Sequence, residues 1–172
     1  GLWASRWMSV LEGMSRADVA VRLTWISGAM LVGFLFMGFF ATGLVRRGIK
    51  LDTIYRGSML LAISLLALIS FQPNFAGNLL WPILGACFSL SNVSYSLAAQ
   101  AFPPALSGRA NTALNLLVFL GAFGLQWGIG ILVDALQTQG WASDAAFRAA
   151  FFTLLGGQLL ALLWMVRPGR QV

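Results

Sequence analysis

Residues 110–133 read ANTALNLLVFLGAFGLQWGIGILV and contain no charged side chain. A helix needs about 20 predominantly apolar residues to cross about 30 Å of hydrocarbon, and this stretch is long enough. Four further apolar stretches, nearly free of charge, lie at 21–45, 52–71, 77–102 and 145–166. The sequence therefore predicts an all-α membrane protein, a polytopic helical bundle that forms a single transmembrane domain over residues 1–172.

The composition of the whole chain agrees with this prediction. Hydrophobic residues make up 59% of the chain and charged residues 9%, and the mean hydropathy is +0.81. Water-soluble globular proteins carry about 25% charged residues, so the composition excludes that class. The isoelectric point of about 11.1 reflects basic loops between membrane spans. Nucleic-acid binding is not expected, because it needs a basic patch on a folded, water-exposed surface.

Basic residues are concentrated on one side of this up-and-down path. That side carries Arg46, Arg47, Lys50, Arg56, Arg109, Arg167 and Arg170, with Asp52 as its one acidic residue. The other side balances Arg6, Arg16, Arg22 and Arg148 against Glu12, Asp18, Asp134 and Asp144. Loops rich in Lys and Arg are retained in the cytoplasm, so we predict a cytoplasmic C-terminus and an N-terminal segment on the outer side.

The residue types that carry enzyme chemistry are almost missing. The chain has no His and one Cys, and its five carboxylates lie near the ends of the predicted spans. General acid–base catalysis and metal sites need such groups gathered in one place, so we expect no enzyme activity, no catalytic residues, no metal and no cofactor. Cys87, in the middle of the third span, is expected to be a small apolar packing residue.

Uncharged polar residues recur at helical spacing in two of the spans. One stripe consists of Gly85, Ser89, Asn92, Ser96 and Gln100, with Tyr95 beside it, and a second of Asn111, Asn115, Ala122 and Gln126. Such stripes allow two interpretations. They can hydrogen-bond neighbouring helices to each other, or they can line a wet cavity that binds a solute. Gly124 and Gly128 form a Gly-x-x-x-Gly pair, which predicts close helix packing.

The chain opens with GLWASRW, in which Trp3 and Trp7 lie one helical turn apart. Trp is enriched at membrane–water interfaces, so this segment can be an interfacial helix. Alternatively, it is the outer end of a sixth, incomplete span.

Several of these segments together resemble the major facilitator superfamily of secondary transporters, specifically its second six-helix half. GLWASRW resembles the outer end of the family's seventh helix. The segment with Pro103, Pro104 and Gly108–Asn111 resembles the connection between helices ten and eleven, and residues 147–151 resemble the start of helix twelve. Residues 45–50, VRRGIK, echo the family's cytoplasmic loop motif. They depart from it at Ala41, Val45 and Ile49, which puts a charge-relay role for this loop in doubt.

The resemblance implies a C-terminal transporter half with five complete transmembrane helices plus a partial one, working by alternating access in a bacterial cytoplasmic (inner) membrane. Its partners would be the missing N-terminal half, the lipid bilayer and a small polar or amphipathic organic solute. The implied substrate-binding residues are Trp3, Trp7, Asn92, Tyr95, Asn115 and Gln126. As an isolated fragment, the chain is expected to self-associate through its open face.

The alternative is a membrane scaffold or assembly subunit that transports nothing. In that case both polar stripes would be satisfied within the bundle or by partner helices. A transporter half would instead leave a large polar-lined face uncovered.

Overall fold

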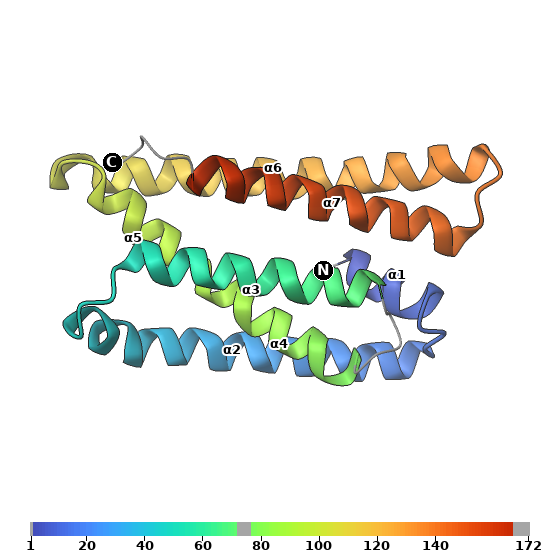
Figure 1. The fold of residues 1–172 in the computed structure, drawn as a ribbon, viewed down its shortest axis with the longest axis horizontal. Coiled ribbons are helices and arrows are strands. Elements are labelled where there is room, and N and C mark those ends of the chain that lie inside the picture. The colour runs from blue at the N-terminus through green and yellow to red at the C-terminus, as the bar shows by residue number, and fades with distance from the viewer. Residues whose placement is uncertain (1, 72–76, 167–172) are drawn as a thin grey trace.

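The computed structural model describes residues 2–71 and 77–166 (Figure 1). Within these residues all regular secondary structure is helical. The α-helices are α1 (Leu2–Val10), α2 (Arg16–Arg46), α3 (Leu51–Phe71), α4 (Gly77–Leu90), α5 (Val93–Gln100), α6 (Ser107–Thr138) and α7 (Ser143–Val166), and a short 3₁₀ helix, η1 (Pro104–Leu106), precedes α6. The all-α prediction is confirmed. Arg167 and Arg170, which contribute to the predicted topology, lie outside the described residues, as does Gly1.

Four of these helical segments are long and apolar enough to cross a membrane. They are Arg16–Phe39 within α2, Leu51–Phe71, Pro104–Thr138 and Ser143–Val166. The chain is therefore a helical membrane protein. Helix α1 has 9 residues, too few for a crossing. The side on which each terminus lies, and the kind of membrane, stay predictions.

The predicted span 77–102 is not one continuous helix, so on this point the prediction is wrong. The structure divides it into α4 and α5, with a turn at Ser91 and Asn92. The side chains of Ser89, Ser91 and Asn92 each donate a hydrogen bond to the carbonyl three residues earlier, at 2.6, 2.6 and 3.0 Å. The backbone N–H groups of Ser91 and Asn92 do the same. Ser and Asn side chains compete with the α-helix for backbone carbonyls. Three such residues lie within four consecutive positions here, and the helix is interrupted.

Helix α2 ends in a glycine turn within the basic segment 45–50. Gly48 has a φ of +86°, a left-handed conformation that glycine adopts without strain. The N–H of Ile49 then reaches back to the carbonyl of Leu44 at 3.1 Å, which closes the helix end. The turn leads directly into α3.

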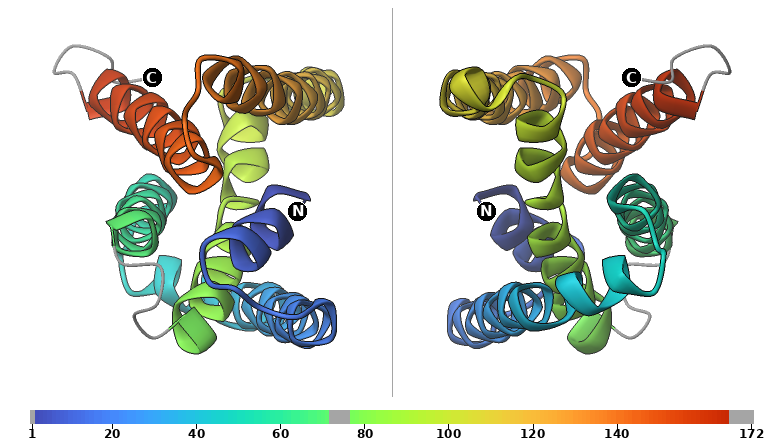
Figure 2. Two further views of the ribbon diagram at one scale, coloured as in Figure 1. Left: turned by 90° about the vertical axis from the view of Figure 1, so that its right-hand side faces the viewer. Right: turned by 90° about the vertical axis from the view of Figure 1, so that its left-hand side faces the viewer.

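The long helices lie side by side, and α4 crosses obliquely between α2 and α3 (Figure 1). Helix α3 also packs against α7, α7 against α6, and α5 against both α6 and α3. Seen end-on, α3 and α7 lie on one side of the molecule (Figure 2). Helices α2 and α6 form the two corners of the other side, with α1 between them, and α4–α5 run through the middle of the molecule. This arrangement leaves α2 and α6 at the edges of the bundle.

Helices α2 and α4 approach each other closely because each contributes a glycine to the crossing. A Cβ atom on Gly85 would lie 3.0 Å from the backbone oxygen of Ile26 and 2.8 Å from its Cγ2 atom. A Cβ atom on Gly33 would lie 2.9 Å from the backbone oxygen of Ala86. Small residues that let backbones meet are the usual basis of helix packing in membranes, where lipid is as apolar as the side chains.

The main apolar core lies among α1, α3, α4 and α7. Trp7 and Met8 of α1 are both 0% exposed, and they pack with buried side chains such as Ile69, Leu84 and Phe151. The short first helix thus fills one end of the bundle with its bulkiest side chains.

Candidate functional site

The predicted site residues fall into two pairs and two single positions. Trp3 belongs to the first pair, and its indole N–H donates to the backbone carbonyl of Gln126 at 3.0 Å. The ring also lies against Gly130, one turn further along α6, where a Cβ atom would be in ordinary contact with it at 3.5 Å. Trp3 also packs against Phe147 of α7, with ring centroids 5.9 Å apart. Trp3 therefore docks α1 onto the α6–α7 hairpin, and the exposed side chain of Gln126 takes no part in this bond.

The second pair joins α5 to α6. The Tyr95 hydroxyl donates to Oδ1 of Asn115 at 2.9 Å. Asn115 is exposed and Tyr95 half-buried, and the amide NH₂ of Asn115 has two N–H donors, which can serve a ligand. Asn115 and Gln126 are three helical turns apart, about 16 Å along the axis of α6, on one face of the helix.

Asn92 and Trp7 lie apart from these pairs. Asn92 precedes α5, is exposed, and donates its amide to the carbonyl of Ser89. Trp7 is fully buried, and its ring centroid lies 4.1 Å from that of Phe151. The indole N–H of Trp7 has no hydrogen-bond partner among the described residues. The structure places Trp7 in the core, where a solute would reach it only after the helices rearrange.

The side chains of the predicted site residues carry no charge. Among residues 2–71 and 77–166, no three His, Cys, Asp or Glu side chains lie close enough together to hold a metal ion. Asn92, Asn115 and Gln126 offer amide donors and acceptors, and Tyr95 a hydroxyl. Such groups suit hydrogen bonding to a neutral or zwitterionic solute. They do not provide a proton relay.

A buried polar network at the end of the bundle where α2 begins was not predicted. Arg22 of α2 forms an ion pair with Glu12, in the connection between α1 and α2, and donates a second hydrogen bond to Oδ1 of Asn78 in α4. The other oxygen of Glu12 accepts from the indole N–H of Trp81 at 3.0 Å. The one available signal was a charged residue inside an apolar stretch, which normally finds a partner within the protein.

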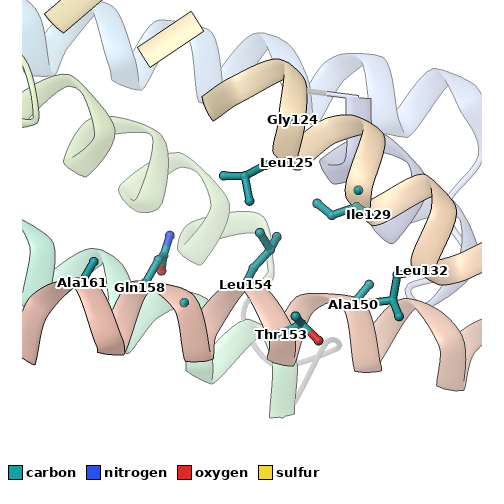
Figure 3. A pocket seen from close by; sticks show the side chains of 11 residues that line it. Gly124, Leu125, Ile129, Leu132, Ala150, Thr153, Leu154, Gln158 and Ala161 are labelled. Carbon is teal, nitrogen blue, oxygen red and sulfur yellow. The ribbon is translucent and has the colours of Figure 1, made fainter. Parts of the chain in front are cut away.

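The α6–α7 hairpin contains a groove of about 560 Å³, shown in Figure 3. Gly124 and Gly128 line it, and a Cβ on either would meet no atom of residues 2–71 or 77–166 within 4 Å. The prediction that this glycine pair makes a close helix contact is therefore wrong, because the two helices diverge here. Gln158 of α7 also lines the groove, and its Oε1 atom is buried without a hydrogen-bond partner among the described residues.

No protein-family model matches the chain, and no curated protein or solved structure matches it either. The fold and the arrangement of its polar residues are therefore the basis for a function. Among residues 2–71 and 77–166 they show four helices long and apolar enough to span a membrane, one divided helix, and polar side chains exposed on α6 and at the break between α4 and α5.

Proposed function

We propose that this chain is one half of a membrane transporter that moves a small polar or amphipathic solute by alternating access. The observation that carries the proposal is the exposure of Asn92, Asn115 and Gln126, three amide side chains within or beside apolar helices. An amide without a partner in hydrocarbon costs several kcal/mol. These three side chains must therefore meet either water or another protein segment.

The burial of the spanning helices supports an open face on the same side. Of the 18 most apolar consecutive residues of α6, 11% are buried in the structure. The same share is 17% for α2, 22% for α7 and 28% for α3. Helices α2 and α6 are the two edges that flank α1 and α5 (Figure 2). A second half that packed against these edges would enclose the polar face in a central cavity.

The divided helix α4–α5 supports the same proposal. Irregular backbone at membrane depth is tolerated where it is buried in protein or lines a wet cavity. In secondary transporters, discontinuous helices form substrate and ion sites near the middle of the bilayer. Here the break at Ser91–Asn92 lies in the chain just before Tyr95, which contacts Asn115 on α6.

In this proposal the residues have distinct roles. Asn115 and Gln126 offer side-chain amides to the solute at two depths, Asn92 marks the break between α4 and α5, and Tyr95 orients Asn115. Trp3 supplies an aromatic wall, and Trp7 anchors α1 in the core beneath it. Because none of these side chains is charged, they suit a neutral or zwitterionic solute with hydrogen-bonding groups.

A scaffold or assembly subunit is the second candidate, and the Tyr95–Asn115 hydrogen bond favours it. That bond satisfies part of both polar stripes within the bundle, as a self-contained protein would require. A scaffold would cover the remaining amides with partner helices and keep water away from them.

The first experiment is to read the DNA upstream of Gly1 in the source genome. A transporter half of this kind requires a frame that continues through about six further hydrophobic spans, the number of one repeat in transporters built from two six-helix halves. A start codon at or just before Gly1 would contradict the proposal and favour the scaffold.

A further inference from the structure

A hollow of about 680 Å³ opens beside the buried Arg22 network, at the end of the bundle where α2 begins. Arg22 is 9% exposed and lines this hollow together with Asp18 and Asn78. Two guanidinium nitrogens of Arg22 are bound to Glu12 and Asn78, whereas the buried Nε–H has no partner among the described residues. Nε is covered by protein atoms and does not face the hollow, but each terminal nitrogen of Arg22 carries a second N–H group that an acceptor in the hollow can meet.

Asp18 supplies the opposite charge in the same hollow. It precedes Arg22 by one helical turn, so the two side chains lie on one face of α2. Arg22 is turned toward Glu12, and Asp18 makes no ion pair within the described residues. Its carboxylate accepts a hydrogen bond from the Ser15 hydroxyl at 2.6 Å and keeps capacity for a cationic donor. The hollow therefore presents an acceptor for a cation and a donor for an anion one turn apart.

The remaining lining indicates an occupant with an apolar part. Trp25, Val21 and Leu79 line the hollow and are 68%, 58% and 62% exposed. All three follow Asp18 or Asn78 toward the middle of their helices, in the direction of the hydrocarbon. Trp is enriched at the level of lipid headgroups, where one end of a ligand is wet and the other apolar.

We propose that this hollow binds the headgroup of a zwitterionic aminophospholipid, such as phosphatidylethanolamine. The ammonium group lies on Asp18, a phosphate oxygen accepts from a terminal N–H group of the Arg22 guanidinium, and the start of an acyl chain lies along Trp25 and Leu79. Charge complementarity selects this lipid, because an anionic lipid without an amine would leave Asp18 facing a phosphate. The site does not depend on the proposed transport function.

The test is lipid retention by the purified chain, measured by native mass spectrometry after equilibration with equal amounts of phosphatidylethanolamine and phosphatidylglycerol. We expect the wild type to retain phosphatidylethanolamine about tenfold better, the size of one charge-assisted hydrogen bond. Asp18→Asn should abolish this preference while it keeps the hydrogen-bonding atoms at the start of α2. Size-exclusion chromatography and a melting curve verify that the variant folds.

Asp144→Asn is the matched control, because Asp144 is an exposed acid in the first turn of α7, at the same end of the bundle. It should retain the wild-type preference. The proposal is overturned if the wild type shows no preference, or if Asp18→Asn and Asp144→Asn behave alike. Displacement of the lipid by equimolar soluble phosphoethanolamine would equally contradict a lipid occupant, since the acyl chain would then contribute nothing.

Discussion

Arg22 has partners from two other parts of the chain, Glu12 and Asn78, and the Arg22–Glu12 ion pair is buried inside the bundle. The side chains of Arg22 and Glu12 are 10% and 6% exposed. Loss of one partner from a buried ion pair leaves the other charge uncompensated, which typically costs about 3–5 kcal/mol. The Asp52–Arg56 pair on α3 offers a contrast, because its side chains are 45% and 38% exposed and the pair spans one helical turn.

Glu12→Gln should therefore lower the free energy of unfolding by about 3 kcal/mol. Asp52→Asn should lower it by less than about 0.5 kcal/mol, the usual worth of an exposed pair one turn apart on a helix. Unfolding of the purified protein in mixed detergent micelles measures both values. Equal losses in the two variants would contradict the account of Arg22 as a buried, network-bound charge.

The sequence shows these charges but not their pairing. Arg22 binds Glu12 and Asn78, which lie 10 and 56 residues away from it along the chain. Trp81 binds Glu12 across 69 residues. Spacing along the chain cannot reveal such contacts, because they depend on how α4 crosses α2. For the same reason, the helical positions of Tyr95 and Asn115 predicted polar faces, whereas their mutual hydrogen bond emerges only from the packing of α5 on α6.

At the scale of elements, the crossing of α2 and α4 depends on glycine. A Cβ at Gly85 would press on Ile26 at 2.8 Å, and the nearby backbone oxygen cannot move aside as a side chain can. Gly121 of α6, by contrast, would have no described atom within 4 Å of an added Cβ atom.

Gly85→Ala is expected to destabilise the protein by about 1–3 kcal/mol, because the α2–α4 crossing becomes overpacked. Gly121→Ala should be neutral or stabilise it by up to about 1 kcal/mol, since alanine favours the helix. Melting temperatures in one detergent compare the two variants. A stabilising effect of Gly85→Ala would show that the helices do not meet at this glycine.

Helix length and apolar composition were sufficient to predict α2, α3, α6 and α7. The same criteria failed at 77–102 because the polar stripe keeps its helical spacing across the break. What interrupts the helix is the local competition of Ser89, Ser91 and Asn92 for backbone carbonyls. Three such residues within four positions are a usable signal, although the hydrophobic pattern alone conceals it.

At the scale of the whole molecule, the proposed function requires that the face between α2 and α6 meets water. The sequence predicted a polar face but could not define its edges, since the order of helices around a bundle follows from tertiary packing. In the structure, α2 and α6 are the least buried spans, and Asn115 and Gln126 project from α6 without being covered.

The most direct measurement is cysteine labelling in sealed membrane vesicles with a charged, membrane-impermeant thiol reagent. The lone Cys87 is first replaced by Ala, and single cysteines are then placed at Asn115 and Gln126, with Leu160, an exposed apolar residue of α7, as the control. Thiols react as thiolates, which require water. We expect Asn115→Cys and Gln126→Cys to react from both sides of the membrane, and Leu160→Cys not to react. Protection of all three positions to the same degree would contradict it.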